Sequence, residues 1–183
     1  MSRTYKFANP EGIYFITFAT VSWVDVFTRK DYKDILIDSL QYCQKEKGFI
    51  LYGYVIMTNH VHFIARAKDG NNLSDIIRDF KKFTSKQLVM AIDSNRQESR
   101  KEWMLSIFRK AGKQNSNNKE YQFWQQHNHP IELYSNAVID QKMDYIHNNP
   151  VVEGVVSMPE DYLYSSARNY AGLDNMLEIE LMN

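Results

Sequence analysis

The chain has 183 residues, of which 44% are hydrophobic and 24% charged, a balance typical of a folded domain rather than a disordered chain. Its one cysteine, Cys43, cannot form an intrachain disulfide, no run of 18 apolar residues occurs, and the polar first ten residues lack the apolar core of a secretory signal. A disulfide scaffold and a membrane-spanning protein are therefore excluded, and we expect one cytoplasmic domain over residues 1–183, with no membrane partner.

The formal net charge is zero, but the charges are unevenly distributed along the chain. Residues 1–65 carry a net charge of +1, residues 66–119 carry +7 and residues 120–183 carry −8. A basic middle segment can bind phosphate even in a neutral protein, although a solvated helical face would give the same count. Charge alone leaves both interpretations open.

The first half of the chain alternates between strand and helix patterns. Runs rich in β-branched and aromatic residues predict strands over 13–21, 49–57 and 60–67. Apolar residues at helical spacing predict helices over 31–47 and 73–92. The strands 49–57 and 60–67 form either a hairpin or one long kinked strand.

The second half has weaker signals. We expect a mobile insertion near 93–120, a short strand near 130–133 and an irregular tail from about 173. Ser135 or Asn136 can begin a helix that Pro150 should end. The order strand, helix, strand, strand, helix, strand, helix resembles a split βαββαβ unit, which predicts an α+β fold with a central antiparallel sheet.

Two histidines in the strand 60–67 are candidate metal ligands. His60 and His62 are two residues apart, so their side chains share one face of the strand and can bind one divalent cation. Two strand histidines can equally form ordinary hydrogen bonds, and their spacing alone does not decide. A second pair, His127 and His129, lies in a polar segment without a strand pattern, so we rank it lower.

A candidate nucleophile lies on the last long helix. Tyr145 and Asn149 are four residues apart, so they project from one helical face. A phenol is a weak nucleophile near neutral pH because its ordinary pKa is about 10. A divalent cation that polarises a phosphodiester would allow a phenolate to attack it in line. Two imidazoles and an amide carbonyl would leave sites on Mg²⁺ or Mn²⁺ open for the phosphate.

These segments resemble a known family. Residues 55–62, VIMTNHVH, are similar to the HUH motif of single-tyrosine transposases. Residues 144–151, DYIHNNPV, resemble the nucleophile helix in the form typical of REP-associated tyrosine transposases. Three further segments match that group: FKKFTS at 80–85, FWQ at 123–125, and 159–167. The resemblance covers roughly residues 12–172, and five motifs in order are specific.

The resemblance implies a ferredoxin-like antiparallel sheet, a substrate of single-stranded DNA that contains hairpins, and a covalent 5′-phosphotyrosine intermediate. His60 and His62 match the metal-binding histidines, and Tyr145 matches the nucleophile. Asn149 falls where related insertion-sequence enzymes have a glutamine ligand, and asparagine is one methylene shorter. The stretch 93–120 also departs from shorter relatives.

We expect DNA phosphates to contact the basic middle segment, through side chains after the histidine strand and along the helix 73–92: Arg66, Lys68, Arg78, Lys81, Lys82 and Lys86. Trp103, Trp124 and Tyr121 are candidates for base stacking, although a core position suits each equally well.

The leading hypothesis is a metal-dependent DNA transposase that nicks and rejoins single strands through Tyr145. The alternatives are an inactive or domesticated nucleic-acid-binding domain, and a phosphodiesterase that uses activated water and needs no tyrosine. We expect a homodimer, with two segments as candidate surfaces, the region 7–21 and the acidic tail. The tyrosine could serve its own chain or the partner.

Overall fold

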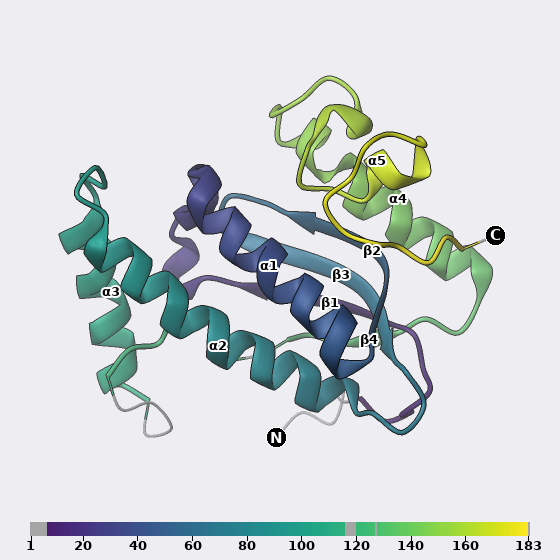
Figure 1. The fold of residues 1–183 in the computed structure, drawn as a ribbon, viewed down its shortest axis with the longest axis horizontal. Coiled ribbons are helices and arrows are strands. Elements are labelled where there is room, and N and C mark those ends of the chain that lie inside the picture. Colours follow the sequence, from purple (N-terminus) through teal and green to yellow (C-terminus); the bar gives the residue numbers. More distant parts are fainter. Residues whose placement is uncertain (1–6, 116–119, 127, 183) are drawn as a thin grey trace.

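The computed structural model describes residues 7–115, 120–126 and 128–182, and it has an antiparallel sheet at its centre (Figure 1). The described strands are β1 (Tyr14–Ala19), β2 (Phe49–Ile56), β3 (His60–Ala67) and β4 (Ile131–Glu132). Their order in the sheet is β2-β3-β1-β4, with antiparallel neighbours. The predicted α+β, ferredoxin-like antiparallel sheet is confirmed.

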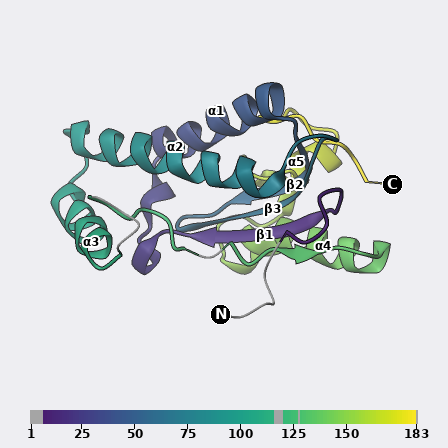
Figure 2. The ribbon, with the colours of Figure 1, turned by 90° about the horizontal axis from the view of Figure 1, so that it is seen from below.

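Helices cover both faces of this sheet (Figure 2). The helices α1 (Lys30–Lys47) and α2 (Leu73–Ser94) lie on one face, and α4 (Asn136–Val152) lies on the other. Side chains of β3 alternate between these layers, since His62 contacts Tyr145 of α4 and the next residue, Phe63, contacts Phe80 of α2. The alternation directs both His60 and His62 toward α4.

One glycine allows α4 to approach the sheet closely. Gly53 of β2 faces α4, and a Cβ atom there would lie 2.6 Å from Sδ of Met143 and 2.8 Å from Cδ1 of Ile146. Both side chains are buried in the core. Because Tyr145 lies between them in sequence, the contact at Gly53 also sets the distance of Tyr145 from the sheet.

The strands 49–57 and 60–67 are a hairpin, which resolves the alternative left open by the sequence. The segment 93–120 contains the helix α3 (Lys101–Lys113), which the sequence did not predict. Its expected mobility stays a prediction.

The expected end of the last long helix at Pro150 is wrong. Pro150 lies inside α4, which runs on to Val152. Asn149 and Pro150 are buried, and the backbone N–H of Glu153 donates to the carbonyl of Asn149 over 3.0 Å. The packing of α4 against the sheet therefore outweighs the tendency of proline to end a helix. The turn that follows α4 contains Gly154, whose φ is +69°.

The last described residues form no long element. After η3 (Pro159–Asp161) and the short α5 (Ala167–Tyr170), residues 173–182 lie against α1 and β2 without helix or strand. Gln41 of α1 donates to the carbonyl of Met176 over 2.9 Å, Glu180 donates its N–H to the carbonyl of Leu51 over 3.0 Å, and Leu177 is buried. Much of the apolar surface of the tail thus packs against other parts of the same chain. No helix in the described part of the chain has the length and apolar character needed to cross a membrane.

Candidate active site

The two histidines lie together on an internal strand. β3 pairs with β2 on one side and β1 on the other, so the backbone at both histidines is held by the sheet. The ring centroids of His60 and His62 are 4.8 Å apart. His62 is buried and His60 is half-buried. The sheet therefore preorganises two imidazoles at one point.

Hydrogen bonds leave the outer nitrogens of both rings available. Oδ1 of Asn59 can only accept, so the 2.7 Å contact means that Nδ1 of His60 donates and Nε2 keeps its lone pair. Nδ1 of His62 lies 2.7 Å from Oγ1 of Thr17, and a bond donated to this hydroxyl leaves the Nε2 lone pair of His62 free as well. This tautomer is the one that binds metals through Nε2.

Burial keeps both imidazoles neutral. It lowers the pKa of His60, and burial together with the nearby charges of His60 and Lys142 lowers the pKa of His62 to about 3. A neutral imidazole is the form that binds a metal. The site is thus ready for a cation across the neutral pH range.

Tyr145 lies beside His62 of the same chain. Its ring centroid is 5.3 Å from that of His62, with the planes at 76°, and 6.0 Å from that of Phe15. Half of the Tyr145 side chain is exposed, at 50%. The ammonium of Lys142 lies 5.8 Å from the Tyr145 ring centroid and 4.9 Å from that of Phe15. An accessible phenol therefore has a cation and a histidine as neighbours.

Asn149, one helical turn after Tyr145, is 9% exposed. Within the described part of the chain, its Oδ1 atom and Nε2 of His62 are buried without a hydrogen-bond partner. A buried polar atom left unpaired destabilises a protein by about 1–3 kcal/mol, so two of them near one tyrosine need an explanation. A divalent cation would supply it, because imidazole nitrogen and amide oxygen are both metal ligands.

The candidate metal ligands named so far, His60, His62 and Asn149, include no carboxylate. Among the described residues, no group of three His, Cys, Asp or Glu gathers at one point. His60, His62 and Asn149 are the residues that could hold a cation, and burial lowers the pKa of His60 although the carboxylates of Glu153 and Asp25 act in the opposite direction. The residues present fit such a metal.

The predicted DNA-contacting residues fall into separate groups. Arg66 shares the histidine face of β3, where its Nε donates to the hydroxyl of Tyr52 over 2.7 Å, and Lys68 is exposed beyond the strand. Arg78 forms ion pairs with Asp75 and Asp79 on α2, on the opposite face of the sheet. The six basic residues therefore do not form one continuous track.

Lys81 differs from its neighbours on α2. Its Nζ donates to the carbonyl of Gln125 over 2.8 Å and to Oδ1 of Asn128 over 2.6 Å, and burial lowers its pKa to about 8. Lys82 and Lys86 are exposed. An open groove of about 700 Å³ lies between Arg78, Lys81 and Lys82 of α2 on one side and residues 121–126 with Asn128 on the other.

The candidate stacking residues also separate. Trp124 is buried at 5% and donates its indole N–H to Oγ1 of Thr84, so it belongs to the core. Trp103 on α3 is 54% exposed, and the hydroxyl of Tyr121 accepts from Arg109 over 3.3 Å. In the second histidine pair, His127 lies outside the described residues, and His129 is exposed with a φ of +40°.

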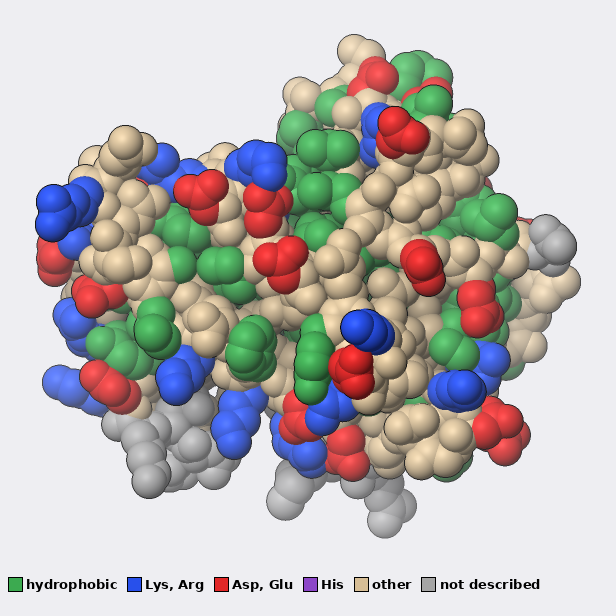
Figure 3. Space-filling model, viewed as in Figure 1, with side chains coloured by type: hydrophobic (Ala, Val, Ile, Leu, Met, Phe, Trp, Pro, Cys, Tyr) green, Lys and Arg blue, Asp and Glu red, His purple; other side chains and the backbone are tan. Residues whose placement is uncertain are grey.

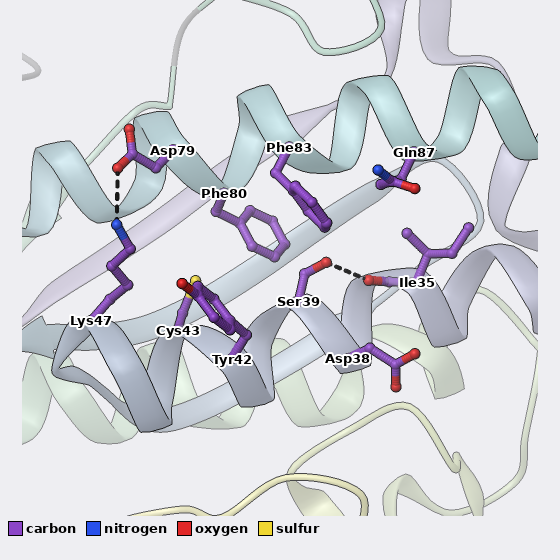
Figure 4. Close-up of a pocket in the computed structure, with 10 residues that line it drawn as sticks. All are labelled: Ile35, Asp38, Ser39, Tyr42, Cys43, Lys47, Asp79, Phe80, Phe83 and Gln87. Carbon is purple, nitrogen blue, oxygen red and sulfur yellow. Dashed lines mark hydrogen bonds and ion pairs between the residues drawn. The ribbon is translucent and has the colours of Figure 1, made fainter.

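A second cavity, of about 520 Å³, lies between α1 and α2 (Figure 4). The ion pair of Lys47 and Asp79, at 3.5 Å, spans one end of it. Burial raises the pKa of the Cys43 thiol in its wall to about 11, which keeps this group unreactive. Hydrophobic side chains are prominent on this face, and no described histidine shows there (Figure 3). The described residues that line this cavity thus include none of the candidate catalytic or metal-binding residues.

Sequence reasoning missed four neighbours of the site: Thr17, Trp23, Asn59 and Lys142. Asn59 directly precedes His60, and Lys142 lies three residues before Tyr145, so local spacing could have suggested both. Thr17 reaches His62 only through the pairing of β1 with β3, which no local pattern reveals.

Comparisons with known proteins place this chain in a family and show its fold in a solved structure. A family model described as "Transposase IS200 like" matches residues 11–121, a segment that includes both histidines and ends before Tyr145. A solved structure of a REP-associated tyrosine transposase bound to a REP hairpin has a TM-score of 0.64 and 18% identity, over 100% of this chain and 94% of that chain. A crystal structure described as a transposase from Deinococcus radiodurans has a TM-score of 0.41 and 18% identity, over 81% of this chain and 95% of that one. No curated protein matches the sequence.

Proposed function

We propose that this chain, which belongs to the family of IS200-like transposases, nicks and rejoins single-stranded DNA through Tyr145. One observation carries the proposal: an accessible phenol lies 5.3 Å, ring to ring, from a histidine whose Nε2 is buried and unpaired. The match of the family supports a transposase role, and this geometry supports the tyrosine mechanism.

The proposed step is an in-line displacement at phosphorus. Oη of Tyr145 forms a bond to phosphorus, the P–O3′ bond breaks, and the leaving 3′-oxygen takes a proton from water. The products are a 5′-phosphotyrosine and a free 3′-hydroxyl. The exposed phenol can release its proton to solvent, and the ammonium of Lys142 stabilises negative charge beside it. His60, His62 and Asn149 would hold Mg²⁺ or Mn²⁺, which when bound polarises the phosphodiester.

We further propose that the substrate contains hairpins. The related REP-associated transposase, whose fold this chain shares, was solved with a REP hairpin. Lys82 and Lys86 are exposed on α2 and suited to phosphate contacts, with Arg66, Lys68 and Arg78 as further cations. Lys81, which is bonded to Gln125 and Asn128, would instead hold the segment that borders the groove.

An inactive nucleic-acid-binding domain is the alternative function. The exposed phenol beside the histidines favours the enzyme, because a domain that only binds DNA has no use for this arrangement. The same observation disfavours a phosphodiesterase that uses water. A cytoplasmic location stays an expectation from the sequence.

The proposed homodimer also stays a prediction. A ring distance of 5.3 Å between Tyr145 and His62 supports a site made by one chain. Mixing His60→Ala protein with Tyr145→Phe protein should therefore give no cleavage, whereas recovered cleavage would require a site shared between subunits. Light scattering would report the oligomeric state.

The proposal is tested by trapping the covalent intermediate. Labelled hairpin-bearing single strands are incubated with Mg²⁺ or Mn²⁺, and a denaturing gel is examined for a protein–DNA adduct. Tyr145→Phe should abolish the adduct and leave DNA binding intact. The matched control is Tyr134→Phe, since Tyr134 is 84% exposed. An adduct that persists in Tyr145→Phe would refute the assignment.

A further inference from the structure

An exposed tryptophan lies at the edge of the histidine site. Trp23 belongs to η1 (Val21–Trp23), the turn that follows β1, and its side chain is 56% exposed. Its ring centroid is 5.9 Å from that of His60, with the planes at 70°. Trp23 thus presents a large, flat aromatic face to solvent beside one candidate metal ligand.

The backbone around Trp23 is held in an unusual conformation. Ser22 and Trp23 both have a φ of +55°, in the left-handed region that L side chains rarely adopt. Local hydrogen bonds maintain the turn: Oγ1 of Thr20 donates to the carbonyl of Val24 over 2.8 Å, and the N–H of Trp23 donates to the carbonyl of Thr20 over 3.1 Å. Such conformations concentrate at functional sites.

One amide group links this turn to the candidate metal ligand. Oδ1 of Asn59 accepts from His60 over 2.7 Å, and Nδ2 of Asn59 donates to the carbonyl of Trp23 over 3.3 Å and to Oδ1 of Asp25 over 2.9 Å. Oδ1 of Asp25 also accepts from the hydroxyl of Thr58 over 2.7 Å. Asn59 therefore fixes the backbone of Trp23 and the imidazole of His60 relative to each other.

We infer that Trp23 is a stacking platform for an unpaired nucleobase of single-stranded DNA next to the phosphate that is cut. This inference rests on the proposed function, because it takes the histidine site as the place of cleavage. Every base has a flat face, so an aromatic platform holds a strand without reading its sequence. Stacking one base beside His60 would fix the neighbouring phosphodiester with respect to Tyr145.

Binding without cleavage provides the first test. In a Tyr145→Phe background, the affinity for a fluorescent 12-nucleotide oligothymidine is measured by anisotropy with Mn²⁺ present. Trp23→Ala should weaken binding about 5- to 150-fold, the usual loss for one stacked base. Tyr42→Ala is the matched control, because Tyr42 is 57% exposed on α1, across the sheet from α4, and its affinity should stay within about twofold of the parent. Equal affinities for the parent and Trp23→Ala would overturn the inference.

A conservative variant keeps the test valid if Trp23→Ala folds poorly. Trp23→Phe retains an aromatic face and should bind oligothymidine within about threefold of the parent, since phenylalanine also stacks on bases. The change in indole fluorescence on adding the oligonucleotide should be lost in Trp23→Phe. A signal that persists in Trp23→Phe would contradict stacking at Trp23.

The position of the base is tested in a strand that forms the Tyr145 adduct. An abasic nucleotide beside the cut should slow adduct formation by the wild-type protein, and Trp23→Ala should add little further loss, because both changes remove the same contact. Independent, multiplicative losses would place the stacked base elsewhere. If no adduct forms but Trp23→Ala still loses affinity, the proposed cleavage fails while the stacking role survives.

Discussion

Replacing Asn149 by leucine should stabilise the metal-free protein, although it removes a residue of the proposed active site. Oδ1 of Asn149 is buried and unpaired, and leucine has a similar size with no polar atom to satisfy. An unpaired buried polar atom destabilises by about 1–3 kcal/mol, so the substitution should recover a gain of that order. For a chain of this size, about 1 kcal/mol shifts Tm by about 2–4 °C, which gives an increase of about 2–12 °C.

Metal should stabilise the wild type much more than it stabilises Asn149→Leu. A cation that binds only the folded state stabilises it by about 2.7 kcal/mol at 100 times its Kd, which corresponds to about 5–11 °C for the wild type. Asn149→Leu should lose most of this shift, because it removes a ligand. Function and stability would then conflict at one side chain, as is common in active sites.

The assay is thermal unfolding followed by circular dichroism, in EDTA and in a Mn²⁺ titration. Asn148→Leu is the matched control, since Asn148 is exposed and its amide donates to the carbonyl of Asp144 on its own helix. It should keep the Mn²⁺ shift and gain no stability. A lower Tm for Asn149→Leu in EDTA, or a Mn²⁺ shift equal to that of the wild type, would refute the assignment of Asn149 as a ligand.

Three other substitutions test the packing beneath Tyr145, the stability of the fold in acid and the contact with DNA. Gly53→Ala should destabilise the fold by about 1–3 kcal/mol and slow adduct formation, because the added methyl group meets Met143 and Ile146. Adding Met143→Ala should restore part of the stability and part of the rate. Unchanged kinetics of adduct formation in Gly53→Ala would argue against this contact. Glu98 is bound by Arg29 and Arg100, which hold its pKa down to about 2, so its stabilising contribution is complete above the ordinary pKa of about 4.5 and is lost as pH falls toward 2. Glu98→Gln should flatten the pH dependence of urea unfolding between pH 5 and about pH 2, and an acid limb like that of the wild type would contradict this. Lys82→Gln should weaken binding to all single strands alike and lower the salt slope by about 0.7, whereas a sequence-selective loss would place Lys82 at a base edge.

Local patterns predicted most of the fold. The strand and helix bounds of the first half were predicted within about two residues, because their hydrophobic periodicity agrees with the final packing. The end of α4 was missed because the burial of Asn149 and Pro150 depends on the sheet, which lies far away in sequence. The helix α3 was missed because its apolar residues, centred on Met104, Leu105 and Phe108, are few and lie in a polar context.

The sequence predicted which residues form the candidate site, and the fold shows which of these residues lie next to one another. The family match confirms the resemblance to single-tyrosine transposases, and it ends before Tyr145. Only the packing of α4 on the histidine face shows that Tyr145 is next to His62 in one chain. The contacts of His62 with Thr17 and of Tyr145 with Phe15 join residues more than 40 positions apart, which periodicity cannot predict.

The neutral donor set has a further consequence for how the site would work. Two imidazoles and one amide offset none of the charge of a divalent cation, whereas a carboxylate ligand would offset part of it. The attraction for an anionic phosphodiester would then be strong, and the cation itself would be held weakly until the DNA arrives. Hydrogen bonds that the two rings donate to Asn59 and Thr17 counter this weakness by fixing both rings before any ligand binds. Metal and DNA should therefore bind cooperatively, and the rigid sheet would hold the ligands in position although none of them is charged.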